Sequence, residues 1–147
     1  MRADNKVLLE GAYAAWAARD LGATLACFAE NVAFTIHLPP EVAPFAGEVR
    51  GRDELGKRLQ AILDDFDFLA YRPQQITSQG LSFHSQVYFH YRHKTTGLDY
   101  EGTMRHVWLI AGDQIVDFEE FHDMERVRAF FGLLAHAAAQ RSGGDGA

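Results

Sequence analysis

Cysteine is nearly absent from this sequence. The 147 residues include one cysteine, Cys27, so an internal disulfide is excluded. Cys27 lies in the apolar run TLACFA, where a small buried hydrophobic residue is a simpler interpretation than a nucleophile. A chain of this length can bury a full core without covalent cross-links, and we expect it to do so.

Long hydrophobic runs and an excess of basic residues are missing as well. No segment approaches the roughly 18 apolar residues of a membrane span, and the first residues, MRADNK, lack the apolar centre of a secretory signal. The 14 Lys and Arg against 20 Asp and Glu leave a net charge of −6, which provides no footprint for nucleic acid or an anionic membrane. We therefore expect a cytoplasmic protein that binds neither.

Helical periodicity dominates the first half of the chain. Apolar residues at helical spacing predict helices over residues 4–18, over 21–31 and from an N-cap at Asp53 onward. A single strand, residues 32–38, and a loop rich in Pro and Gly lie between the second and third of these helices.

Alternation replaces helical spacing from residue 71 onward. It predicts four strands, over residues 71–78, 81–93, 98–110 and 114–122. Asp123 then caps a last helix. Helices first, an antiparallel meander next and one closing helix indicate an α+β fold. We expect one domain over residues 1–140 and a disordered Gly-rich tail at 141–147.

Three segments carry a resemblance to a known family. They are YAAWAARDLGATLACFAENV near the start, PFAGEVRGRDEL before the third helix, and DQIVDFEEFHDMERVRAFF at the end. In this order and spacing the chain resembles the nuclear transport factor two-like superfamily, in particular its SnoaL-like branch related to ketosteroid isomerases. The resemblance implies a cone-shaped, curved antiparallel sheet wrapped around helices, with a mostly apolar ligand pocket and a homodimer formed through the outer sheet face.

The catalytic sets of two enzymes with this fold are not retained. The Tyr and two Asp positions of ketosteroid isomerases fall on Ala12, Ile36 and Arg105, although Tyr13 and His37 each lie one residue away from two of them. The Arg and first Asp of limonene epoxide hydrolases fall on Val87 and Phe89. Their last acid falls on Glu120, a position at which SnoaL-like cyclases also carry an acidic base.

The last hairpin supports a pocket position for Glu120 independently of the family. If Gly112 and Asp113 form a two-residue loop with Gly first, each further step along both strands keeps the two positions opposite. Arg105 then faces Glu120 across the strands, with Cβ atoms about 5 Å apart. The apolar pairs of the same register, Leu109 with Val116 and Val107 with Phe118, would share the buried face.

The predicted site is therefore a polar cluster inside an apolar cone. Arg105 would orient a ligand oxygen and Glu120 would move a proton. The residues expected to line the cone are Trp16, Phe34, Ile36, Val87, Phe89, Tyr91, Glu101, Thr103, Val107 and Phe118. His122 is expected at the rim or on the surface, and the other histidines show no spacing typical of metal ligands. We expect neither a metal ion nor a cofactor.

Two functions remain open from the sequence. One is a cofactor-independent isomerase, cyclase or lyase that acts on a small apolar carbonyl compound. The other is a non-catalytic ligand-binding or dimeric accessory domain, in which the Arg–Glu pair only satisfies two charges. The mixture of His84, Gln86, Tyr88, Met104, His106 and Trp108 on the opposite sheet face suits a homodimer interface.

Overall fold

The computed structural model describes residues 3–41 and 45–145 and confirms the α+β prediction. The helices in this part of the chain are α1 (Ala3–Ala17), α2 (Leu21–Ala26), α3 (Arg52–Asp65) and α4 (Met124–Asp145). The strands are β1 (Phe28–His37), β2 (Gly47–Arg50), β3 (Phe66–Gln79), β4 (Ser82–His93), β5 (Asp99–Ala111) and β6 (Gln114–Phe121).

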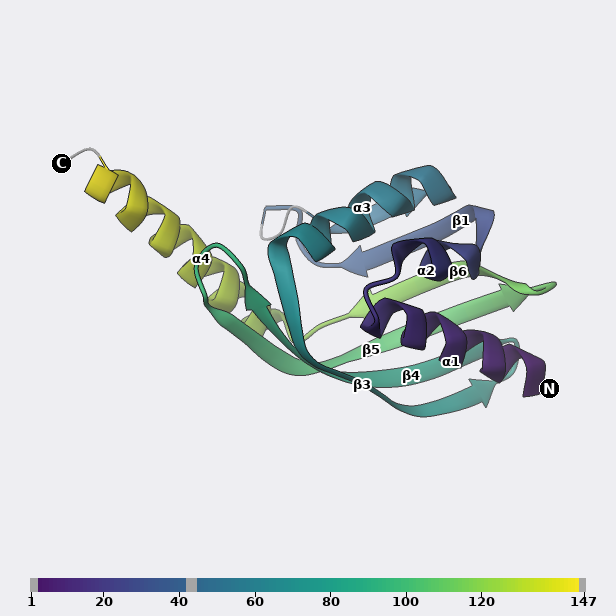
Figure 1. Cartoon of the computed structure of the whole chain (residues 1–147). Coiled ribbons are helices and arrows are strands. Elements are labelled where there is room, and N and C mark those ends of the chain that lie inside the picture. Colours follow the sequence, from purple (N-terminus) through teal and green to yellow (C-terminus); the bar gives the residue numbers. More distant parts are fainter. Residues whose placement is uncertain (1–2, 42–44, 146–147) are drawn as a thin grey trace.

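The strands form one curved, open sheet in the order β2-β1-β6-β5-β4-β3. All neighbours are antiparallel except β1 and β6, which run parallel. Helices α1, α2 and α3 lie over one face of this sheet, and α4 projects from one end (Figure 1). The sheet wraps around the helices as the cone-shaped fold requires, and the space between them is where a pocket can form.

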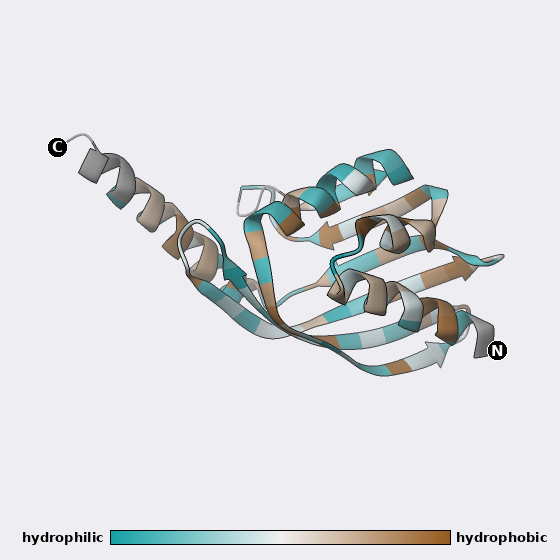
Figure 2. Ribbon diagram, viewed as in Figure 1, coloured by the Kyte–Doolittle hydropathy of each residue, from teal (hydrophilic) through white to brown (hydrophobic). Residues whose placement is uncertain are grey.

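Alternation along the strands produces the face that the helices cover. On β4 the inward residues Phe83, Ser85, Val87 and Phe89 are buried, and the residues between them are more exposed. On α3 the buried residues, Leu55, Leu59, Ile62 and Leu63, recur at helical spacing. Figure 2 shows polar colour over much of α3 and alternating colours along the strands. The core therefore lies between the concave face of the sheet and the helices.

Several predicted boundaries are wrong. The second helix ends at Ala26 instead of residue 31, because residues 28–31 extend β1 backward beside β6. Helix α3 begins one residue before Asp53, with Gly51 at the N-cap at φ 89°, a conformation that favours glycine. Asp123 does cap α4, since its Oδ1 accepts from the backbone N–H groups of Glu125 and Arg126.

The backbone of α4 continues to Asp145, and the disorder expected for residues 141–147 stays a prediction. Within residues 3–41 and 45–145, no helix combines the length and the apolarity that crossing a bilayer requires. The cytoplasmic location also stays a prediction.

A β-bulge in the last hairpin decides which side chains meet Glu120. Gly112 adopts φ 63° in the predicted two-residue loop, and Ala111 pairs with Gln114 as expected. The register then shifts, because Ile110 pairs with Ile115 but Leu109 pairs with Asp117. Val116 is the extra residue on β6. From this point onward the predicted register is wrong by one residue.

Candidate functional site

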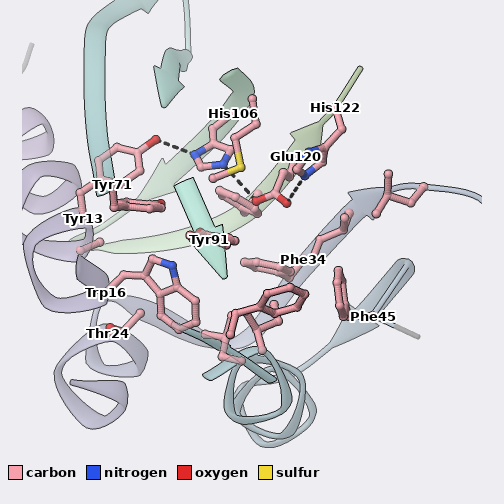
Figure 3. Close-up of a pocket in the computed structure, with 18 of the residues that line it drawn as sticks. Tyr13, Trp16, Thr24, Phe34, Phe45, Tyr71, Tyr91, His106, Glu120 and His122 are labelled. Carbon is pink, nitrogen blue, oxygen red and sulfur yellow. Dashed lines mark hydrogen bonds and ion pairs between the residues drawn. The ribbon is translucent and has the colours of Figure 1, made fainter. Parts of the chain in front are cut away.

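A pocket opens between the concave sheet face and the helices. Its empty volume is about 840 Å³, including the space at its open mouth. Its lining is mostly aromatic and aliphatic, and Figure 3 shows many of these side chains around one cavity. The aromatic and histidine side chains of the lining are Tyr13, Trp16, Phe28, Phe34, Phe45, Phe66, Tyr71, Tyr91, Tyr100, His106, Trp108, Phe118, His122 and Phe131.

One carboxylate, Glu120, lies in this wall between two imidazoles. Its Oε1 is 3.1 Å from Nε2 of His106, and its Oε2 is 2.6 Å from Nε2 of His122 (Figure 3). The Glu120 side chain is only 14% exposed. Burial raises the pKa of the Glu120 carboxyl, but the charge of His122 and the hydrogen bonds from both histidines outweigh burial and hold this pKa well below its usual range. Glu120 is therefore an anion stabilised by two N–H donors.

The bulge is the reason that His106 meets Glu120. It places His106 opposite Glu120, and Arg105 opposite Phe121. It also allows Ile115, which is fully buried, to share the inner face with Phe118 and Glu120. Without the extra residue, Val116 would share the inner face with Phe118 and Glu120, and Ile115 would point outward.

A second chain of hydrogen bonds approaches His106 from its other side. The Tyr13 hydroxyl on α1 is 2.6 Å from His106 Nδ1 and 2.5 Å from the Ser85 hydroxyl on β4. The indole N–H of Trp108 donates to Ser85 Oγ at 3.0 Å. Burial lowers the pKa of His106, although the hydrogen bond to Glu120 opposes this effect. His106 is thus a neutral ring whose two nitrogens both have partners.

The hydrogen-bond network ends at Tyr100 on the His122 side. Its hydroxyl is 3.2 Å from His122 Nδ1, and its ring stacks on the His122 ring. Burial raises the pKa of the pocket tyrosines Tyr13, Tyr71, Tyr91 and Tyr100, and the charge of Glu120 raises each of them further. These hydroxyls therefore keep their protons at neutral pH and can donate to an oxygen.

The predicted site residues separate into three groups. Trp16, Phe34, Ile36, Tyr91, Phe118 and Glu120 line the pocket. Val87 and Phe89 also face inward and are buried, but they pack in the core instead of lining the cavity.

The four predicted residues of β5 lie on the other face of the sheet. Arg105 is exposed and lies over the Phe121 ring at 4.5 Å, so the predicted Arg105–Glu120 pair does not form. Glu101 accepts a hydrogen bond from Tyr88, and Val107 pairs with Glu119. Thr103 lies opposite Tyr88. The physical cause is the register shift, which turns every β5 side chain to the opposite face.

Sequence reasoning missed the histidines and their partners. His122 was expected at the rim, and Met104, His106 and Trp108 on the outer face; all four line the pocket. The sequence did contain a signal for the buried face of β5. Burying Met104 and Trp108 removes more apolar area from water than burying Val107 and Leu109. A histidine side chain is also easier to bury than the charged side chain of Arg105. Tyr13 and His37 each lie one residue from a catalytic position of ketosteroid isomerases. Tyr13 lines the pocket, and His37 is exposed beside Glu119.

Within the described residues there is no group of three or more His, Cys, Asp or Glu side chains arranged to hold a metal ion. The homodimer predicted for the outer sheet face stays a prediction.

Comparison with known families identifies the fold. The profile of the SnoaL-like domain matches residues 9–118. The chain belongs to the SnoaL-like family. No curated protein matches its sequence closely enough to count as a relative.

Solved structures share this SnoaL-like fold at low sequence identity. An NTF2-like protein of unknown function from Burkholderia pseudomallei has a TM-score of 0.79 at 19% identity, over 88% of this chain and 98% of the other. TerC, co-crystallised with polyporic acid, has a TM-score of 0.78 at 14% identity, over 88% and 99%. A proposed polyketide cyclase from Xanthomonas campestris has a TM-score of 0.72 at 18% identity, over 88% and 98%. At these identities the likeness establishes the fold alone.

Proposed function

We propose that this SnoaL-like protein binds a small, mostly apolar carbonyl compound and moves a proton on it without a cofactor, as an isomerase, cyclase or lyase. The observation that carries the proposal is the buried Glu120 carboxylate held between His106 and His122 in the wall of an aromatic pocket. Groups that exchange protons, in a cavity lined by apolar rings, are the usual components of general acid–base sites.

The chemistry can be assigned to side chains without Arg105. The aromatic lining removes water from the faces of a flat ligand. The hydroxyl of Tyr71 or Tyr91, two lining residues outside the hydrogen-bond network of Glu120, can donate to the ligand carbonyl and stabilise negative charge that develops on its oxygen. The Glu120–His122 pair takes the proton from carbon and returns it elsewhere on the ligand. Glu120 alone is a weak base because its pKa is lowered, so the paired imidazole supplies the basic nitrogen.

Ligand binding can be followed directly, because both tryptophans, Trp16 and Trp108, line the pocket. We expect intrinsic fluorescence to change on titration with cyclic enones, polycyclic hydroxyketones or hydroxyquinones such as polyporic acid, the compound co-crystallised with TerC. Replacing Trp16 with Phe should remove part of this response. No response from any of these compounds would contradict the proposed ligand class.

The catalytic part is tested with Glu120→Gln, which keeps the shape of the side chain and removes its charge. We expect turnover of a bound compound to fall by at least about 100-fold, as loss of a general acid–base group typically causes. Glu119→Gln is the matched control, since Glu119 is the neighbouring residue and pairs with His37 at the exposed face. Equal activity of wild type and Glu120→Gln would eliminate the acid–base role.

A non-catalytic binding domain is the second candidate, and one observation favours it. Both oxygens of Glu120 already accept hydrogen bonds, which weakens any carboxylate base. The two candidates separate in heavy water: a bound ketone exchanges its acidic C–H for deuterium if the pocket moves protons. Binding without exchange would favour the accessory role.

A further inference from the structure

The two imidazoles beside Glu120 differ in what their second ring nitrogen meets. Nδ1 of His106 faces Tyr13, behind which lie Ser85 and Trp108, and all four side chains are buried. Among the described residues, the hydrogen-bond partner of His122 Nδ1 is the Tyr100 hydroxyl, at the longer distance of 3.2 Å, in the pocket lining. The two rings therefore differ in the protonation states that their hydrogen-bond partners can satisfy.

On the His106 side, one arrangement of hydrogens satisfies every group. The Trp108 indole can only donate, so Ser85 Oγ accepts from it. The Ser85 hydroxyl then donates to the Tyr13 oxygen, and the Tyr13 hydroxyl donates to Nδ1 of His106. Nδ1 is therefore unprotonated, and Nε2 carries the hydrogen that it donates to Glu120. Every bond in this chain points toward the carboxylate.

A second proton on His106 would break this chain. Nδ1–H would have to donate to Tyr13, whose own hydrogen would turn to Ser85. Ser85 Oγ would then accept from both Tyr13 and Trp108, and its hydroxyl hydrogen would have no acceptor among the hydrogen bonds of the described residues. Ser85 is only 2% exposed, so water does not replace the lost partner at low cost.

The His122 side has no such restriction. With His122 neutral, Tyr100 donates to Nδ1; with His122 protonated, Nδ1–H donates to the Tyr100 oxygen and the phenolic hydrogen turns toward the pocket. In both states Nε2 donates to Glu120. In the protonated state the Tyr100 hydrogen needs an acceptor from outside the protein, and solvent or a ligand can supply one because Tyr100 is only partly buried and lines the pocket.

We infer that His122, with Tyr100 as its reversible partner, is the imidazole that exchanges a proton in this pocket, and that Tyr13, Ser85 and Trp108 hold His106 as a neutral positioning residue for Glu120. The inference rests on the proposed function for the step in which a ligand receives or supplies that proton. Its structural part concerns the ligand-free protein. Besides each other, the titratable or charged groups around the two rings are Glu120, Tyr13, Tyr100, Tyr71 and Tyr91, and further out Arg58, Asp123 and Arg126.

The test is ¹⁵N NMR of the full-length, ligand-free protein with labelled histidine. The rings are assigned through contacts of His106 with Trp108 and of His122 with Tyr100. Between about pH 8 and about pH 5, the range in which imidazoles commonly titrate, we expect His106 to keep the pattern of a neutral ring protonated on Nε2. His122 should show the larger change. Finding Nδ1–H on His106, or protonation of His106 before His122, would overturn the inference.

The variant Tyr13→Phe tests the direction of the hydrogen bonds on the His106 side independently. Loss of the donor should move the His106 Nδ1 signal downfield, as an unprotonated ring nitrogen does when it loses a hydrogen bond, and Tyr88→Phe on the outer face should leave it unchanged. An unmoved Nδ1 signal in folded Tyr13→Phe protein would contradict the inferred direction. Because no ligand is present, failure here is distinguishable from failure of the proposed function, which Glu120→Gln tests by turnover.

Discussion

The hydroxyl of Tyr13 provides the sharpest test of the buried network, because Tyr13→Phe removes one oxygen and little volume. In the folded protein the change leaves the Ser85 hydroxyl without its acceptor and His106 Nδ1 without its donor. Ser85 and His106 are each only 2% exposed, so water does not take the place of the hydroxyl.

The magnitude follows from the two groups that lose their partners. Each unsatisfied buried polar group costs about 1–3 kcal/mol. The Phe variant no longer buries a hydroxyl, so we take the lower part of the sum and expect a loss of about 2–4 kcal/mol in the free energy of unfolding. For a chain of this size, 1 kcal/mol lowers Tm by about 2–4 °C, so Tm should fall by roughly 4–16 °C.

Chemical denaturation of four proteins checks this reasoning: wild type, Tyr13→Phe, Ser85→Ala and the double variant. Because Tyr13 and Ser85 belong to the same chain of hydrogen bonds, the double variant should lose less stability than the sum of the two single losses, with a coupling energy of about 0.5–3 kcal/mol. Tyr88→Phe is the matched control, since the Tyr88 hydroxyl bonds Glu101 on the outer face, and it should change stability by less than about 0.5 kcal/mol. A Tyr13→Phe loss as small as this control would refute the buried network.

Three further outcomes follow from the site. The pKa of Glu120 is lowered by folding, so its carboxylate contributes stability above about pH 4.5 that is lost as pH falls through the folded pKa; wild type should therefore lose its advantage over Glu120→Gln in acid, as measured by denaturation at several pH values. Arg105→Ala should leave ligand binding within about twofold and reduce stability by about 1 kcal/mol or less, because Arg105 lies over Phe121 outside the pocket; a tenfold loss of binding would contradict this placement. Cysteines introduced at Val107 and Glu119, in a background without the native cysteine, should form a disulfide on mild oxidation, because these residues are opposite each other. Cysteines at Val107 and Phe118 should not, and the reverse result would show that the hairpin has no bulge.

The amino-acid sequence by itself determined the types of the main elements and the direction of Glu120. Period-2 alternation identified the strands of the meander, and the positions of Phe118 and Glu120 on one side of β6 place the carboxylate in the pocket whatever β5 presents to it. Alternation likewise placed Phe34 and Ile36 on one side of their strand, whereas their gathering with Trp16 and Tyr91 around one pocket was implied by the family resemblance. The type of an element and the face on which each of its side chains lies are local features, so the residues of a single strand or helix are enough to predict them.

Only the tertiary structure decided which partners Glu120 has. Ile115 and Val116 are both apolar and β-branched, so alternation cannot tell which of them turns inward, and the bulge that buries Ile115 becomes visible only when β6 pairs with β1 and β5. That one-residue shift replaced Arg105 with His106. The Tyr13–His106 contact joins residues 93 positions apart, and such a contact depends on how α1 packs against the sheet, which no local pattern of residues records.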